Sequence, residues 1–245
     1  MMRDLGIRVR PDQVLVTTGA QQALTLIAEA FIDPDDIIIT EGPTYLGALQ
    51  AFSAFEPDVR AIPFDEDGMR MDLLEEELKR IGKDNPRLKF CYTIPNFQNP
   101  GGVTMTAERR RRLLELAHEY NFMVVEDDPY GRLRYDGGHQ VPLKAMDDSV
   151  IYLGTISKML GPGLRTGWIA APEAVLARIN LVKQGADLCG SAFDQLVVQH
   201  YFADVAWQRT LQKFIALYKE RRDAMLAALD EHFPAEATWT RPEGG

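Results

Sequence analysis

The chain lacks the residue patterns from which proteins usually build a metal centre. Its 245 residues include two cysteines, Cys91 and Cys189, which are far apart, and four histidines that are scattered along the sequence. No HExxH pattern and no cluster of histidines with cysteines is present. We therefore expect no metal site, and we expect both cysteines to be free thiols in a reducing cytoplasm.

Long hydrophobic runs and a surplus of positive charge are also missing. No run approaches the roughly 18 apolar residues that a membrane-spanning helix needs. The opening stretch MMRDLGIRVR has no apolar core of a signal peptide. The formal net charge is −9, from 36 acidic and 27 basic residues, which argues against a nucleic-acid-binding surface. We therefore expect a cytoplasmic protein whose partners are neither membranes nor nucleic acids.

The remaining composition is that of an ordinary globular domain. Hydrophobic residues make up 46% of the sequence and charged residues 26%, which is sufficient for a sizeable core. The opening residues read as the tail of a helix, and the closing residues RPEGG read as an open turn. We therefore expect a fragment: a large domain over residues 1–205, incomplete at its N-terminus, then a connecting helix and the start of a truncated small domain over residues 206–245.

Strand and helix patterns alternate along most of the chain. Short runs rich in β-branched residues predict strands, and segments with a repeat near 3.6 residues predict helices. Continuous apolar strands are typical of an α/β fold in which helices cover both faces of a mostly parallel sheet, here of the seven-stranded type. The expected strands are 14–18, 37–40, 58–64, 88–94, 122–127, 150–155 and 167–171, and the expected helices are 20–32, 45–54, 71–81, 107–120, 173–184, 191–203 and 207–232.

Four consecutive arginines, at positions 109–112, lie in the predicted helix 107–120. Such a run can indicate nucleic-acid binding. A helix spreads consecutive side chains around its axis, however, and acidic residues follow the run. We therefore predict that these arginines form a solvated face.

The ends of the predicted strands carry chemically active residues. In open α/β sheets, ligands bind beyond the carboxyl ends of the strands, so these residues are candidates for one shared site. They offer backbone amides at a helix start, hydroxyls, a guanidinium, an aromatic ring, a carboxylate, an amide, a phenol and an amine. The candidates are Gly19, Ala20, Gln21, Tyr45, Asn99, Asp127, Tyr130, Thr155, Ser157, Lys158 and Arg165.

Together these groups fit a ligand that has both a phosphate and a flat ring. The helix start at 19–21 suits the phosphate, as do the side chains of Thr155, Ser157 and Arg165. Tyr45 offers its aromatic face to the ring, and the remaining candidates fit the edges of that ring. Each residue alone also has a structural explanation, such as a turn glycine or a surface lysine. Their joint placement at strand ends is what favours a site.

Five segments in a fixed order resemble those of a known family. The segments TTGAQQAL, EGPTY, PNFQNPGG, VVEDDPY and GTISKMLGPGLRTGW resemble the class I and II aminotransferases, which are pyridoxal-phosphate enzymes of fold type I. The resemblance runs from about residue 11 to the end, and it is closest to 2-aminoadipate and kynurenine-type aminotransferases and to MocR-like domains. It implies pyridoxal 5′-phosphate as cofactor, L-amino acid and 2-oxo acid substrates, and a homodimer in the full-length parent.

The resemblance also implies a role for each candidate residue. Lys158 would form a Schiff base with the cofactor aldehyde and would then act as base and acid. Asp127 would pair with the pyridinium N–H. The resemblance implies three catalytic residues, which are Lys158, Tyr130 and Asp127. Asn99 and Tyr130 would bind the ring oxygen, and Tyr45 would stack on the ring. The groups implied to hold the phosphate are Gly19, Ala20, Gln21, Thr155, Ser157 and Arg165.

One loop departs from the family pattern, and alternatives stay open. The common NP[TS]G loop reads Asn99-Pro100-Gly101-Gly102 here, which changes a small residue and keeps the asparagine. The stretch TIPNFQNPGG favours a free-standing enzyme over a MocR-type transcription regulator. The alternatives are the cofactor-binding effector domain of such a regulator, a pyridoxal-phosphate-dependent lyase on the same scaffold, and an α/β domain without a cofactor.

The resemblance gives a first prediction about activity. In the family, an arginine of the small domain binds the substrate carboxylate, and we expect this arginine beyond residue 245. Residues 1–245 alone should therefore transaminate poorly or not at all. Formation of 2-oxo acid from a panel of L-amino acids measures this, and robust turnover would contradict the expectation.

Overall fold

The computed structural model describes residues 2–245, in which an eight-stranded sheet lies between helices. The strands are β1 (Val14–Thr17), β2 (Ile37–Gly42), β3 (Asp58–Asp65), β4 (Gly68–Met69), β5 (Leu88–Thr93), β6 (Met123–Asp127), β7 (Ile151–Thr155) and β8 (Gly167–Ala170). The α-helices are α1 (Ala20–Phe31), α2 (Leu46–Ser53), α3 (Met71–Ile81), α4 (Ala107–Tyr120), α5 (Leu143–Met146), α6 (Glu173–Asp187), α7 (Ala192–Asp204) and α8 (Trp207–His232). Three short 3-10 helices are η1 (Met2–Leu5), η2 (Pro11–Gln13) and η3 (Pro162–Leu164).

The centre of the sheet is parallel and its borders are antiparallel. The strand order is β1-β8-β7-β6-β5-β2-β3-β4. Parallel pairing joins β3, β2, β5, β6 and β7, so their carboxyl ends lie along one edge. Strand β8 pairs antiparallel with β1 and β7, and β4 forms a short hairpin with β3. The predicted α/β class and mostly parallel sheet are confirmed, with the two-residue β4 as an unpredicted strand.

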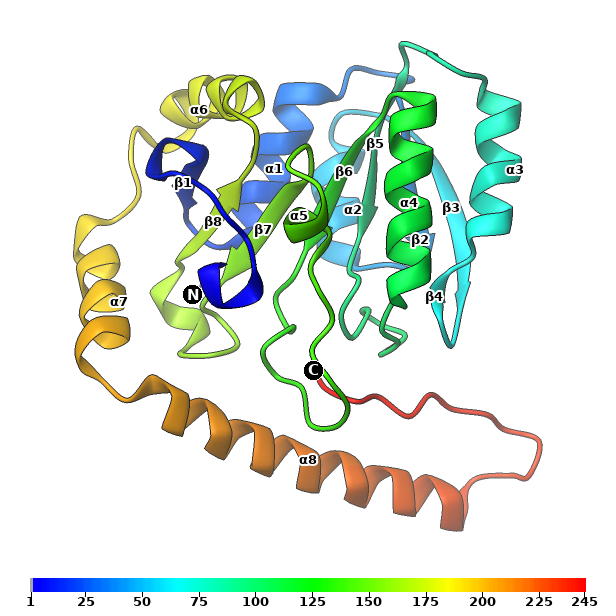
Figure 1. The fold of residues 1–245 in the computed structure, drawn as a ribbon, viewed down its shortest axis with the longest axis vertical. Coiled ribbons are helices and arrows are strands. Elements are labelled where there is room, and N and C mark those ends of the chain that lie inside the picture. The colour runs from blue at the N-terminus through cyan, green and yellow to red at the C-terminus, as the bar shows by residue number, and fades with distance from the viewer. Residues whose placement is uncertain (1) are drawn as a thin grey trace.

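Two hydrophobic layers enclose the sheet. Helices α1, α2 and α6 cover one face and α3, α4 and α5 cover the other (Figure 1). Leu24 and Phe52 are buried in the first layer, and Leu74 and Leu113 are buried in the second. Strand β7 is buried along its whole length, because Ile151 and Leu153 belong to the first layer and Tyr152 packs in a smaller cluster with Ile7. The strand ends that carry the candidate residues are therefore fixed by packing on both sides.

Helices α7 and α8 lie outside the two helical layers, and α8 runs across below the sheet in the view of Figure 1. The buried residues of α8 are Trp207 and Leu211, which pack with Leu133 of the loop that follows β6. After α8 the chain returns toward that same loop (Figure 1). The division into residues 1–205 and 206–245 stays a prediction.

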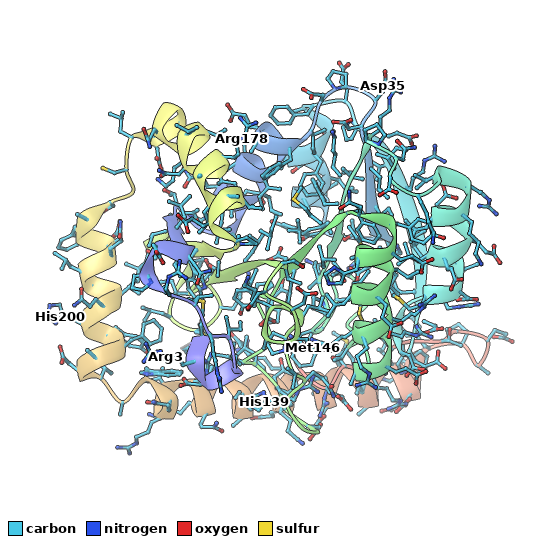
Figure 2. All side chains as sticks on the ribbon, turned by 45° about the horizontal axis from the view of Figure 1, so that its top comes forward. Arg3, Asp35, His139, Met146, Arg178 and His200 are labelled. Carbon is cyan, nitrogen blue, oxygen red and sulfur yellow. The ribbon has the colours of Figure 1, made fainter. Side chains whose placement is uncertain are left out.

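Two further observations concern the described residues 2–245. No group of three or more histidine, cysteine, aspartate or glutamate side chains is arranged to hold a metal ion there. Figure 2 places His139 and His200 on different parts of the surface. Within the same residues, no helix has both the length and the apolar character that crossing a membrane requires.

Arg110 contradicts the prediction that the arginines at 109–112 form a solvated face. Its side chain is 1% exposed. It donates hydrogen bonds to the carbonyls of Pro95 at 2.8 Å and Met105 at 3.0 Å, and to Oδ1 of Asn96 at 2.8 Å. A helix turns by about 100° per residue, so a run of four arginines places one of them toward the sheet. The acceptors are needed because a buried guanidinium without partners is very unfavourable.

Arg110 also lies near a buried carboxylate. Nη1 of Arg110 is 3.9 Å from Oε1 of Glu126, too far for a hydrogen bond. Glu126 instead accepts the backbone N–H groups of Leu143 at 2.9 Å and Lys144 at 2.8 Å. Burial and the neighbouring Asp128 raise the pKa of Glu126 to about 7, and the charge of Arg110 opposes that shift. Arg110 thus joins α4, the loop after β5 and the end of β6.

Replacing Arg110 should therefore destabilise the fold strongly. Arg110→Met removes the donors of three buried acceptors and a compensating charge, and we expect a loss of about 3–5 kcal/mol in the free energy of unfolding. The matched control is Arg111→Met on the exposed face of the same helix, which should change this free energy by less than about 0.5 kcal/mol. Denaturant titration measures both, and equal losses in the two variants would contradict the structural role of Arg110.

Candidate active site

The carboxyl ends of the parallel strands and the start of α1 enclose a cavity of about 280 Å³. It lies where an open α/β sheet binds ligands. All the candidate residues except Gly19 line it, and Gly19 caps the helix that begins at its wall. The candidates on the lining are Ala20, Gln21, Tyr45, Asn99, Asp127, Tyr130, Thr155, Ser157, Lys158 and Arg165.

A larger cleft of about 760 Å³ lies between the β3–β4 hairpin and residues 238–243. Among the described residues that line it, none is a lysine. Two of its carboxylates are already paired, because Asp65 binds Arg109 at 2.5 Å and Glu243 binds Arg134 at 2.6 Å. The smaller cavity therefore holds the reactive groups.

Asp127, at the end of β6, has one carboxylate oxygen paired and the other unpaired. Tyr92 donates its hydroxyl hydrogen to Oδ2 at 2.9 Å, whereas Oδ1 is buried without a hydrogen-bond partner among the described residues. The residue is 3% exposed. Burial raises the pKa of Asp127 to about 7, and the hydrogen bond from Tyr92 opposes this shift. A buried acceptor without a donor costs about 1–3 kcal/mol, so Oδ1 is suited to a donor on a ligand.

Lys158, Tyr130 and Asn99 bring an amine, a phenol and an amide to the same cavity. Nζ of Lys158 is 5.9 Å from the centre of the Tyr130 ring. Burial and the charge of Asp127 raise the pKa of Tyr130, while a hydrogen bond with the Asn99 side chain lowers it. These three side chains can therefore contact one ligand that reaches from Asp127 to Lys158.

A turn after β7 sets the direction of Lys158. Ile156 and Met159 are buried, and the N–H of Met159 donates to the carbonyl of Ile156 at 3.1 Å. The hydroxyl of Thr155 accepts the N–H of Ser157 at 3.2 Å. Because the flanking residues are anchored in the core, Ser157 and Lys158 are left to line the cavity.

The start of α1 forms the end of the cavity that is suited to an anion. Gly19 has a φ of +82°, and a Cβ there would lie 2.5 Å from Nη2 of Arg165. The same Nη2 lies 3.4 Å from the carbonyl of Thr18. The first N–H groups of a helix have no partner within the helix, and Ala20 and Gln21 contribute two of them. The absence of a side chain at position 19 therefore lets the guanidinium of Arg165 lie close to the start of α1, an arrangement that suits an anion.

The side chain of Gln21 supports Tyr45. Its Oε1 accepts the hydroxyl of Tyr45 at 3.2 Å, and its Nε2 donates to the carbonyl of Gly47 at 2.6 Å. The side chain thus fixes the start of α2, and the backbone N–H of Gln21 remains available to an anion. Tyr45 is held with its ring at the cavity wall.

Tyr92 was not predicted as a site residue. It lies opposite Val125 in the parallel pairing of β5 with β6, and Asp127 follows Val125 by two residues. Side chains two apart on a strand share a face, so Tyr92 and Asp127 lie together. A tyrosine near the end of the predicted strand 88–94 was the available signal, but using it requires the register between two strands.

Glu41 is a second buried residue that the sequence did not indicate. Its carboxylate accepts the hydroxyl of Thr93 at 2.6 Å and Nε2 of Gln98 at 3.2 Å. Gln98 in turn accepts the N–H of Gly101 at 2.7 Å. Burial raises the pKa of Glu41 to about 7. Glu41 therefore holds in place the loop that carries Asn99, through its hydrogen bond with Gln98.

Comparison with known families gives one match over nearly the whole chain. The model of the family "Aminotransferase class I and II" matches residues 2–245. The aromatic-amino-acid aminotransferase 1 of Thermococcus litoralis is 51% identical over all of this chain and 59% of its own length. The chain thus spans about three fifths of that relative.

Two solved structures are similar in fold as well as in sequence. A multiple substrate aminotransferase from Thermococcus profundus has a TM-score of 0.92 and 48% identity, over 95% of this chain and 58% of that one. A kynurenine aminotransferase from Pyrococcus horikoshii has a TM-score of 0.93 and 47% identity, over all of this chain and 62% of that one. The predicted family and fold type are confirmed.

The buried carboxylates predict how stability depends on pH. Asp127, Glu41 and Glu126 have folded-state pKa values of about 7, above unfolded values of about 4, so between these pH values the folded chain binds more protons than the unfolded chain. The free energy of unfolding should therefore fall as pH rises from about 4 to about 7. Asp127→Asn should reduce that fall by at most about 1.4 kcal/mol per pH unit.

The control for this prediction is Asp136→Asn. Lys219 and Arg222 hold the pKa of Asp136 below its usual range, so this variant should leave the slope between about pH 5 and 7 unchanged. Denaturant titrations of the cofactor-free chain across this range measure the slope. An Asp127→Asn profile parallel to that of the unmodified chain would show that Asp127 does not take up a proton there.

Proposed function

Because the chain belongs to the class I and II aminotransferase family, we propose that it is the cofactor-binding part of a pyridoxal-phosphate-dependent aminotransferase. The proposed reaction moves an amino group from an L-amino acid to a 2-oxo acid. One observation carries the proposal: the unpaired buried Oδ1 belongs to Asp127, which lines the same cavity as the amine of Lys158. An acceptor at one end and a nucleophile at the other suit a cationic ring with a carbonyl substituent.

The residues of the cavity fit this cofactor. When bound, pyridoxal phosphate supplies an aldehyde that condenses with amines and a protonated ring that accepts electrons from the α-carbon of an amino acid. Asp127 is the proposed acceptor of the ring N–H, and a positive charge there would favour the ionised carboxylate against the effect of burial. Tyr45 is the proposed stacking partner. The proposed phosphate ligands are Gly19, Ala20, Gln21, Thr155, Ser157 and Arg165.

Lys158 is the proposed catalytic residue that bonds the aldehyde. Its amine is also the proposed base that takes the proton from the α-carbon and returns it to the product. Tyr130 and Asn99 are proposed to donate hydrogen bonds to the oxygen on the ring. Both residues line the cavity, and Tyr130 is near Lys158 and close enough to Asp127 for that charge to raise its pKa, which supports these roles.

The relatives support this function over the alternatives. The three relatives described above, which are 47–51% identical to this chain, are named as aminotransferases, and the Pyrococcus enzyme was solved in complex with PMP and KYN as substrates. A lyase on the same scaffold or the effector domain of a MocR-type regulator would use the same lysine, so Lys158 does not distinguish them. The stretch TIPNFQNPGG supports the enzyme.

Further features of the whole protein are part of the proposal. We propose that the parent protein is a homodimer located in the cytoplasm, and that residues 206–245 begin a second, smaller domain. The proposed place of the substrate side chain is a neighbouring space of about 470 Å³, which shares Ser157 and Lys158 with the cavity and which Phe214, Tyr218 and Tyr135 line.

Borohydride trapping tests the central residue of this proposal. Incubation of residues 1–245 with pyridoxal phosphate, followed by sodium borohydride and peptide mapping by mass spectrometry, should place the cofactor on Lys158. Lys158→Ala should lose most of the label, because no other amine lies in the cavity lining among the described residues. Lys213→Ala, on the exposed side of α8, is the matched control and should keep the label. A label spread over surface lysines that Lys158→Ala does not reduce would refute the assignment.

A further inference from the structure

We propose that Tyr92 is a positioning residue that fixes the Asp127 carboxylate, so that Oδ1 meets the ring N–H of a protonated pyridine. The inference rests on the proposed function, because it assigns a role toward the same cofactor. It concerns a residue that does not line the cavity and would act only through Asp127.

The phenol of Tyr92 is held rigidly behind the cavity. The residue is fully buried, and its ring packs edge-to-face against Phe52, with ring centroids 5.5 Å apart at 78°. Its strand is hydrogen-bonded on both sides, to β2 and to β6. The hydroxyl therefore occupies one position, and the bond of 2.9 Å to Oδ2 of Asp127 has little freedom.

That single bond has two effects on the carboxylate. It fixes Oδ2, so that rotation of the carboxylate group is restricted and Oδ1 has one orientation. It also stabilises the charged form of Asp127, whereas burial and the neighbouring Asp128 favour the neutral form. Glu41 is a further acidic group close enough to interact with Asp127. Tyr92 thus opposes several influences that would weaken Asp127 as an acceptor for a cationic N–H.

The next residue in the chain provides a contrast. Tyr152 donates its hydroxyl to Oδ2 of Asp128 at 3.0 Å, in the same manner as Tyr92 does to Asp127. Oδ1 of Asp128, however, accepts Nδ2 of Asn96 at 2.9 Å and the N–H of Gly131 at 3.0 Å. Two successive aspartates therefore each have a buried tyrosine on Oδ2, and Asp127 is the one whose Oδ1 is unpaired.

This contrast supplies a matched pair of variants, Tyr92→Phe and Tyr152→Phe. Each removes one buried hydroxyl that donates to one aspartate and leaves the aromatic ring in place. Two ligands are to be titrated into residues 1–245: pyridoxal phosphate, and its analogue in which C–H replaces the ring nitrogen. The dissociation constant of pyridoxal phosphate divided by that of the analogue reports the contact at the ring nitrogen alone.

The expected result is a change in that ratio for one variant only. Tyr92→Phe should weaken the binding of pyridoxal phosphate about tenfold and that of the analogue by less than about twofold. Only pyridoxal phosphate has a ring N–H that would bind the charged carboxylate of Asp127, and Tyr92 stabilises that charged form. Tyr152→Phe should leave the ratio unchanged. In an Asp127→Asn background, Tyr92→Phe should have no further effect on the ratio.

Each other outcome would overturn the inference. Tyr92→Phe could weaken the binding of both ligands equally, or Tyr152→Phe could change the ratio as much as Tyr92→Phe does, and the role of Tyr92 would then be structural only. If Lys158 is labelled by pyridoxal phosphate while Tyr92→Phe leaves the ratio unchanged, this inference fails and the proposed function stands. Absence of binding of both ligands by the unmodified chain would overturn the proposed function and this inference together.

Discussion

The parallel pairing of β2, β5, β6 and β7 is the constraint on which the site depends. Hydrophobic layers cover both faces of these strands, so a shift in register would move apolar side chains and the buried polar groups out of place. Because the carboxyl ends coincide, side chains from positions 45, 99, 127 and 158 meet at one cavity. No single loop could hold these groups at fixed distances, whereas a sheet packed on both sides does so.

The same arrangement places several acidic groups where water does not reach. Glu41 is buried near the end of β2, Glu126 and Asp127 are buried at the end of β6, and burial raises the pKa of each. Glu41 and Glu126 receive hydrogen bonds on both of their oxygens, from Thr93, backbone amides and other side chains. Asp127 receives a bond on one oxygen only. The unpaired oxygen is a local cost to stability that a cationic ligand would offset, which links folding and binding.

The sequence predicted seven of the eight strands and the location of the cavity for a physical reason. Buried strands need continuous apolar runs, and ligands bind where such strands end, so the residues after each run were sufficient to find the cavity. The antiparallel direction of β1 and β8 was beyond such reasoning, because an apolar run has no direction. Strand β4 and helix α5 are too short to show a period.

The residues that the sequence did not reveal depend on contacts between elements. Tyr92 acquires its role from the register of β5 against β6. Arg110 lies three residues before the buried Leu113, so the helical period places it on the apolar face of α4. That placement was available from the sequence, but arginine is so rarely buried that a solvated face was predicted instead. Its partners, the carbonyls of a loop after β5, become apparent only in three dimensions.

The main proposal is that one ligand spans the cavity from Asp127 to Lys158 with its phosphate at the start of α1. A crystal structure of residues 1–245 soaked with pyridoxal phosphate is the sharpest test. We expect the ring nitrogen within hydrogen-bonding distance of Oδ1 of Asp127, a covalent link to Nζ of Lys158, and the phosphate on the N–H groups of residues 20 and 21. A ligand bound elsewhere, or one whose ring nitrogen faces away from Asp127, would contradict the proposal.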